Sequence, residues 1–182
     1  MELRKALPFD VLELDIYKMK GVDGQSTMKN KTILCAIDFS ESSADAMHWA
    51  IQMAQLTDEQ VVFLFCYRLI GAGNEDGTLD LKRNIENDAV RKYNEMQKIL
   101  VRDQDVSCKF ISEVGFFPFR IENFIRNGAV NMLVLGNSII DNFDEYKNLN
   151  FDMFLKSTKI PVVVVPVVSR EPVKLSRSSS SL

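Results

Sequence analysis

Two positions in the sequence stand out as places where a ligand could bind, because each follows a short apolar run. Asp38 follows residues 32–37, and Gly136 follows residues 132–135. A carboxylate offers oxygen atoms to a ligand, and a glycine lets the backbone come close to one. We therefore take Asp38 and Gly136 as the first candidates for a binding site.

Residues suited to acid–base or nucleophilic catalysis are few. The only histidine is His48, which has no candidate partner beside it and is expected on a solvated or partly packed helix position. The hydroxyls of Ser40, Ser42 and Ser43 are interpreted as helix caps, because the nucleophile motif G-x-S-x-G is absent around them. We predict no catalytic residue.

Known phosphate-binding motifs are also absent. The sequence has no G-x-G-x-x-G after its first apolar run and no G-x-x-x-x-G-K-S/T. An acidic run, Asp141, Asp144 and Glu145, is interpreted as a solvated loop face, with cation binding as the alternative. We therefore predict no metal ligand and expect a protein that is not an enzyme.

From residue 31 onward, apolar runs alternate with amphipathic stretches, which is typical of strands alternating with helices. This alternation predicts an α/β domain with a five-stranded, mostly parallel sheet and helices on both faces. In such a sheet a ligand sits beyond the strand ends where the winding reverses. The predicted strands are residues 32–37, 61–67, 106–111, 132–136 and 161–166; the predicted helices are 42–56, 78–102, one between Pro118 and Gly128, and 146–158.

The composition narrows the class of protein. The chain has 182 residues, a formal net charge of −3 and no cluster of five basic residues, so nucleic acid is not an expected partner. No apolar run approaches the roughly 18 residues of a membrane span, and the first residues lack a signal-peptide core. The separated cysteines Cys35, Cys66 and Cys108 are expected to be reduced and packed in the core. We expect a cytoplasmic protein.

Three segments resemble one known family. Residues 33–40 (ILCAIDFS), followed by Ser43 and a helix with Trp49, resemble the opening of a universal stress protein. Residues 113–115 (EVG) and 128–136 (GAVNMLVLG) resemble its third-strand exit and fourth strand, and residues 159–166 (KIPVVVVP) its last strand. The resemblance covers about residues 28–168. It implies the universal stress protein fold, which is like that of the adenine-nucleotide α-hydrolases, a role associated with stress responses, and a homodimer formed through the last strand.

Family members that bind ATP carry a glycine loop after the fourth strand, in the pattern G-x-x-G, about nine residues, then G-S or G-T. Here Gly136 is present, Ile139 stands at the second glycine, and no glycine follows. A β-branched residue such as Ile139 resists the positive φ that glycine allows. The resemblance also places Asp38 beside the nucleoside in ATP binders.

Two functions follow from this comparison. We expect a protein without a cofactor that acts by dimerising and by binding another protein, whose identity the sequence does not give. The alternative is a nucleotide switch or weak ATPase that holds ATP with magnesium through a rearranged loop. Its candidate cofactor-binding residues are Asp38, Gly136, Asn137 and Ser138.

The last strand, Val162 to Val168, is almost wholly β-branched. An uncovered strand edge of this kind pairs with another chain, so we expect it to form the dimer interface; the alternative is a strand in the sheet interior. The phenylalanines Phe116, Phe117 and Phe119 are expected to make core contacts where a helix begins, with an exposed partner patch as the alternative.

The two flanks depart from the family. Residues 1–27 are either a true N-terminal extension, whose apolar residues pack on the domain, or the product of an upstream start codon, with Met28 as the native start. Both interpretations stay open. Residues 169–182 are predicted to be a disordered, serine-rich tail.

Overall fold

The computed structural model describes residues 31–70, 75–100, 105–128, 130–141, 143 and 150–167. The expected extension (residues 1–27) and tail (residues 169–182) lie outside the described residues, as do Gly71, Gly73, Asp144 and Glu145. The elements follow in the order β1 (Thr32–Ile37), α2 (Glu41–Thr57), β2 (Gln60–Tyr67), α3 (Glu75–Leu100), β3 (Cys108–Val114), α4 (Phe117–Asn127), β4 (Val130–Gly136), α5 (Asn137–Asp141), α6 (Phe151–Ser157) and β5 (Val162–Val165).

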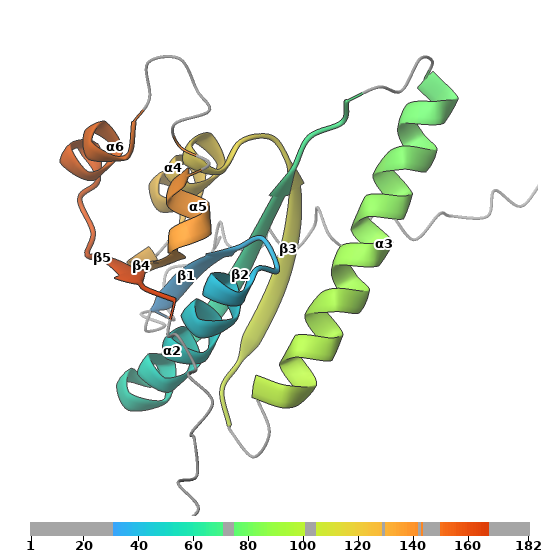
Figure 1. Cartoon of the computed structure of the whole chain (residues 1–182). Helices are drawn as coiled ribbons and strands as arrows, with labels where there is room; N and C mark the ends of the chain where they lie inside the picture. Colours follow the sequence, from blue (N-terminus) through green and yellow to red (C-terminus); the bar gives the residue numbers. More distant parts are fainter. Residues whose placement is uncertain are drawn as a thin grey trace, which may run out of the picture.

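The five strands form one parallel sheet in the order β3-β2-β1-β4-β5, which confirms the predicted fold class (Figure 1). β1 lies in the centre, and all six of its residues are buried, as a continuous apolar run in a parallel strand requires. The chain winds from β1 outward to β3 and then crosses back to β4. The winding therefore reverses between β1 and β4, beside the ends that carry Asp38 and Gly136.

Helices cover both faces of the sheet, as predicted. On one face α2 and α3 bury a core that includes Met47, Ile51, Phe63 and Tyr93. On the other face α4, α5 and α6 bury a second core that includes Ile121, Leu133, Ile139 and Phe154. Each fully buried aliphatic or aromatic side chain stabilises the fold by about 1.5–3 kcal/mol relative to an exposed one. In Figure 1, α3 and α6 lie at opposite sides of the molecule.

The three cysteines are free thiols, with Cys35 and Cys66 buried and Cys108 half-buried. The expected core positions are therefore confirmed for Cys35 and Cys66, whereas Cys108 begins the edge strand β3 and is only partly covered. Burial raises the pKa of the Cys108 thiol to about 11, so this thiol is protonated near neutral pH.

Several predicted boundaries were wrong. α2 begins one residue earlier than predicted, and its N-cap is Ser40, whose Oγ accepts a hydrogen bond from the backbone N–H of Ser43. Gly77, predicted in a loop, lies inside α3. β3 covers Cys108–Val114 rather than residues 106–111. The short helix α5 was not predicted, and the described part of the last predicted helix is α6.

β5 is an edge strand, because it pairs with β4 and stands last in the sheet order. The alternative of an interior position was therefore wrong. The strand is also shorter than the predicted Val162–Val168 segment, since it ends at Val165, and Val168 lies outside the described residues. The side chain of Val164 is 38% exposed.

The phenylalanines at the start of α4 were expected to make core contacts, with an exposed partner patch as the alternative, and the structure shows one of each kind. Phe117 is buried in the second core, so it makes the expected helix-entry contact. Phe119, in the first turn of the helix, is 45% exposed. Phe116 precedes the helix and is half-buried, with the guanidinium of Arg68 5.4 Å above its ring.

Gly115, between β3 and α4, is predicted to be essential for stability. It has a φ of +141°, and a Cβ there would lie 2.7 Å from Nε of Arg120. That Nε donates a hydrogen bond to the carbonyl oxygen of Val114 at 2.8 Å, so the guanidinium cannot easily withdraw. We expect Gly115→Ala to lower the free energy of unfolding by about 1–3 kcal/mol, as measured by urea denaturation.

The same substitution in an Arg120→Ala background separates the two causes of this loss. Without Arg120 the steric contact is gone and only the backbone cost remains, so Gly115→Ala should cost less there. An equal cost in both backgrounds would show that the Arg120 contact is not a cause.

Candidate functional site at the reversal of the sheet

Asp38 and Gly136 are neighbours in space because β1 and β4 pair in parallel. Ala36 of β1 lies in register with Leu135 of β4, so the two strands end at the same edge of the sheet. α2 starts three residues after Asp38, and α5 starts directly after Gly136 (Figure 1). The first turns of these two helices therefore meet over the strand ends.

A tight turn shapes the exit from β1. Phe39 has a φ of 64°, which is uncommon for a residue other than glycine. The ring of Phe39 packs against Phe65, with 5.0 Å between ring centroids, and this contact helps to hold the strained turn. The turn bends the chain back, so that the backbone N–H of Ser40 donates to Oδ1 of Asp38 at 3.0 Å.

The carboxylate of Asp38 is held by serine hydroxyls. Ser40 Oγ donates to Asp38 Oδ1 at 2.6 Å, and Ser43 Oγ donates to the same oxygen at 2.5 Å. Partial burial alone would raise the pKa of Asp38, but hydrogen bonds from Ser40, Ser43 and Ser138 outweigh it and hold the pKa below its usual value. Oδ1 of Asp38 is therefore satisfied by groups of the protein itself.

Ser138 joins this cluster from α5. Its Oγ lies 2.8 Å from Ser40 Oγ and 2.7 Å from Ser42 Oγ, and its backbone N–H donates to Ser42 Oγ at 3.2 Å. A serine hydroxyl has one proton, and that of Ser40 goes to Asp38. In its contacts with Ser42 and Ser138, Ser40 Oγ can therefore only accept. The hydroxyls form one hydrogen-bonded cluster beside the carboxylate.

Gly136 is needed here for close packing. A Cβ at this position would lie 2.6 Å from the backbone oxygen of Ser42 and 2.8 Å from its Oγ. The first turn of α2 thus rests directly on the end of β4. The space beside the one glycine of the family loop that this chain has is filled by α2.

Ile139 is part of the core rather than of a loop. It lies in α5, is fully buried, and belongs to the same cluster as Phe143 and Phe154. A glycine loop would need extended or left-handed backbone with bare N–H groups, whereas this segment is helical and anchored by an apolar side chain. The described residues therefore do not fit the phosphates of ATP.

The structure brings together three of the four candidate cofactor-binding residues. Asp38, Gly136 and Ser138 meet at the strand ends, whereas Asn137 is exposed at the start of α5. Whether any of them contacts a ligand stays a prediction. The serine cluster was not predicted, because Ser40 and Ser42 were interpreted as helix caps alone. The four-residue spacing of Ile139 and Phe143 was the signal that could have revealed a buried turn of helix.

Other kinds of site find little support in the described part of the chain. His48 is exposed on α2, and Asp141 is exposed at the end of α5. The described residues include no group of three His, Cys, Asp or Glu side chains placed to hold a metal ion. Among the described helices, none has both the length and the apolar composition to cross a membrane.

The fold and the position of the site define an α/β domain of the type that places a ligand where the winding of the sheet reverses. The model of the universal stress protein family matches residues 29–166, well over half of the sequence. The chain belongs to the universal stress protein family. No curated protein sequence matches it significantly.

Solved structures show the same fold at low sequence identity. UspA from Lactobacillus plantarum is 16% identical, with a TM-score of 0.55 over 76% of this chain and 99% of that one. A universal stress family protein from Burkholderia pseudomallei is 17% identical, with a TM-score of 0.56 over 78% and 99%. The Archaeoglobus fulgidus universal stress protein in complex with dAMP is 15% identical, with a TM-score of 0.51 over 76% and 99%.

The lowered pKa of Asp38 predicts how stability depends on acid. The hydrogen bonds that lower this pKa exist only in the folded chain, so their stabilisation is present above the ordinary aspartate pKa and is lost as the pH falls through the folded value. Asp38→Asn should therefore flatten the fall in unfolding free energy between about pH 5 and pH 2. Urea denaturation over this pH range is the measurement.

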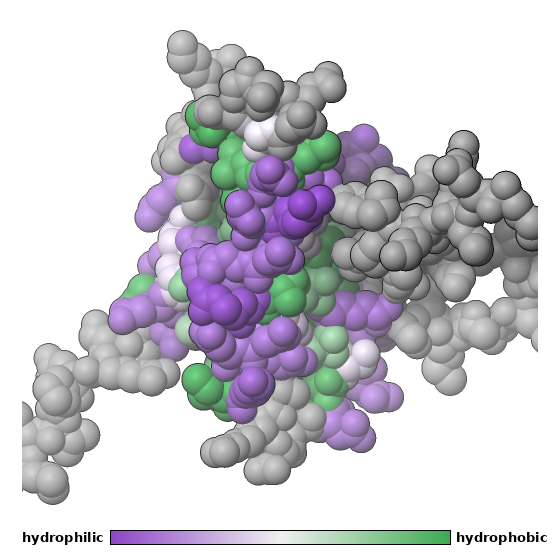
Figure 2. Space-filling model, turned by 90° about the vertical axis from the view of Figure 1, so that its right-hand side faces the viewer, coloured by the Kyte–Doolittle hydropathy of each residue, from purple (hydrophilic) through white to green (hydrophobic). Residues whose placement is uncertain are grey.

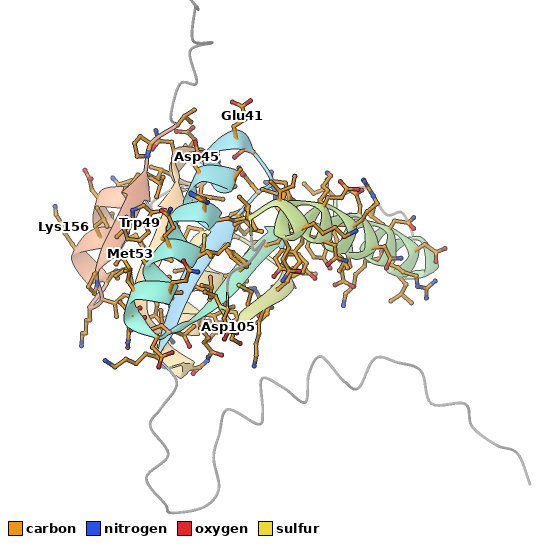
Figure 3. The ribbon with its side chains drawn as sticks, turned by 90° about the horizontal axis from the view of Figure 1, so that it is seen from below. Glu41, Asp45, Trp49, Met53, Asp105 and Lys156 are labelled. Atoms are coloured by element: carbon orange, nitrogen blue, oxygen red, sulfur yellow. The ribbon has the colours of Figure 1, made fainter. Side chains whose placement is uncertain are left out.

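Asp105→Asn is the matched control. Asp105 is exposed before β3, away from Glu41 at the start of α2 (Figure 3). This variant should keep the acid dependence of the wild type. If the unfolding free energy of Asp38→Asn fell with pH as steeply as that of the wild type, Asp38 would not be the cause of the acid dependence.

Proposed function

We propose that this universal stress protein acts in the cytoplasm as a homodimer that binds another protein, without catalysis and without ATP. The main support for this proposal is the position of the backbone oxygen of Ser42, which lies 2.6 Å from where a Cβ of Gly136 would stand. The only glycine that remains from the family loop is thus used to pack α2 on β4. The close approach that its missing side chain permits is therefore made by α2 and not by a phosphate.

The serine cluster supports the same proposal. A ligand entering beside Asp38 would have to replace the hydroxyls of Ser40, Ser43 and Ser138. Each internal hydrogen bond of this kind contributes roughly 1 kcal/mol, and those to a charged carboxylate contribute more. A ligand that displaced them would have to compensate for each one before it gained affinity.

The alternative function is a nucleotide-responsive switch. One observation supports it. Asp38 and Ser138 still meet at the reversal of the sheet, and a universal stress protein of the same fold forms a complex with dAMP. A nucleoside without phosphates would need no glycine loop. The ligand experiment below therefore includes adenosine.

The proposed dimer surface is the outer edge of β5. Exposed apolar side chains occur on β5, after it and on α6, the helix that precedes it in the chain. Their exposed fractions are 38% for Val164, 45% for Val167, 53% for Met153 and 39% for Leu155.

The surface around β5 differs from the far side of the molecule. Figure 3 shows Trp49 and Met53 on the side of α2 that is turned toward β5 and α6. The outer surface of α3 is dominated by hydrophilic residues (Figure 2) and carries ion pairs within the helix, such as Arg91–Glu95 at 3.0 Å. An edge strand flanked by apolar side chains is the surface that pairing with a second copy would cover.

Nucleotide binding can be tested by thermal unfolding. A ligand at a hundred times its Kd adds about 2.7 kcal/mol, which would raise Tm by roughly 5–10 °C in a domain of this size. We expect no shift with saturating Mg-ATP, AMP or adenosine. A shift with Mg-ATP that Asp38→Ala abolishes would establish the switch instead, and a shift with adenosine alone would show a nucleoside site.

The dimer can be tested by substituting Val164 with lysine. A charged side chain in an edge strand disfavours pairing with another edge, and Val164 is exposed enough to tolerate it. Light scattering after gel filtration should give about twice the 20.7 kDa chain mass for the wild type and one chain mass for Val164→Lys. Leu56→Lys, at a residue that is 81% exposed on α2, should leave the dimer intact. A monomeric wild type, or a Val164→Lys dimer, would contradict the proposed interface.

A further inference from the structure

A groove of about 340 Å³ runs along the outer side of α4. Its lining includes Phe116 and Phe119 at the start of the helix and Arg120, Glu122, Asn123 and Arg126 further along. Phe119, Asn123 and Arg126 are three or four residues apart, so they share one face of the helix. The groove is separate from the serine cluster and from the β5 edge, and neither proposed activity uses it.

The groove combines apolar and cationic side chains. Phe119 is 45% exposed, and Arg68 extends the positive charge by lying over the Phe116 ring at 5.4 Å. The side chain of Arg126 is 74% exposed, and its ion pair with Glu122 is long, at 3.8 Å. An exposed pair of this kind contributes little, so Arg126 remains able to bind another carboxylate. An extended segment with alternating apolar and acidic residues would complement this surface.

Such a segment occurs near the beginning of the same chain. Residues 9–16, FDVLELDI, contain five apolar residues, three acidic ones and no basic one. Residues 12–16 alternate strictly, so an extended backbone places Leu12, Leu14 and Ile16 on one side and Glu13 and Asp15 on the other. The apolar side can therefore cover Phe119, while the long, exposed side chain of Arg126 reaches past the edge of the segment to its acids.

The strand pairing shows that this segment can reach the groove. Thr32, at the start of β1, pairs with Val130, which comes three residues after the end of α4. The chain therefore enters the domain beside the C-terminal end of α4. The residues between Ile16 and Thr32 can span up to roughly 50 Å when extended, whereas the eleven residues of α4 measure about 16 Å.

We propose that residues 9–16 dock in the α4 groove of their own chain, with the side that carries Leu12 and Leu14 covering Phe119 and the acids at the edge of the segment within reach of Arg126. Covalent attachment favours this occupant, because a tethered segment has an effective concentration in the millimolar range and competes well with separate proteins. The docked segment gives the N-terminal extension a role in covering an apolar surface of the domain. It also goes beyond the proposed function, since it needs neither a dimer nor an empty nucleotide site.

Hydrogen exchange of the full chain, measured by mass spectrometry, tests this docking. Leu12→Ser with Leu14→Ser should make the amides of residues 119–127 exchange roughly fivefold faster, because the helix loses the cover that protects it from local opening. Leu3→Ser with Met19→Ser, which lie in the same extension but outside the segment, should leave this exchange unchanged. Unchanged exchange in β1 shows in each case that the domain remains folded.

Charge reversal tests the orientation of the segment. Arg126→Glu should accelerate exchange of α4, and adding Glu13→Lys should restore part of the protection. If the amide hydrogen exchange of α4 is unchanged by the Leu12 and Leu14 substitutions, the proposal is wrong. Protection that is lost on dilution would also overturn it, because the occupant would then be a second copy of the chain.

Discussion

The structure depends on one close contact, between the first turn of α2 and the end of β4. The backbone oxygen of Ser42 lies where a side chain at position 136 would begin, 2.6 Å from the Cβ that glycine lacks. This contact brings Ser42 within reach of Ser138 and so connects the two halves of the sheet beyond β1 and β4. The hydroxyl cluster around Asp38 depends on this approach, because Ser42 and Ser138 come from the two segments that it brings together.

The site is therefore closed by the protein's own groups. In a parallel α/β sheet the reversal of winding leaves an open space at the strand ends. Here serine hydroxyls occupy that edge, and Ile139 and Phe143 draw the following segment into the core. The same scaffold then offers its edge strand and its outer helices for interaction.

Local sequence patterns predicted the parts of the fold that local forces decide. β1 and β4 were found because a buried parallel strand is an unbroken apolar run. β3 was misplaced because it is an edge strand, whose residues Cys108–Val114 are mostly half-buried and mix charged with apolar types. Asp38 and Gly136 were found from their place after apolar runs. The serine cluster was not, because Ser42 and Ser138 are 96 residues apart and only the tertiary fold joins them.

The burial of Ile139 has an evolutionary consequence. A change to glycine at this position would restore one residue of the family's nucleotide loop. It would also remove a fully buried side chain, at a cost of about 2–5 kcal/mol for the cavity, and place glycine in a helix, at about 1 kcal/mol more. Since a domain is stable by only about 5–15 kcal/mol, a lineage could not easily pass through this single step. The packing of Ile139 in the core thus opposes the appearance of a glycine at this position.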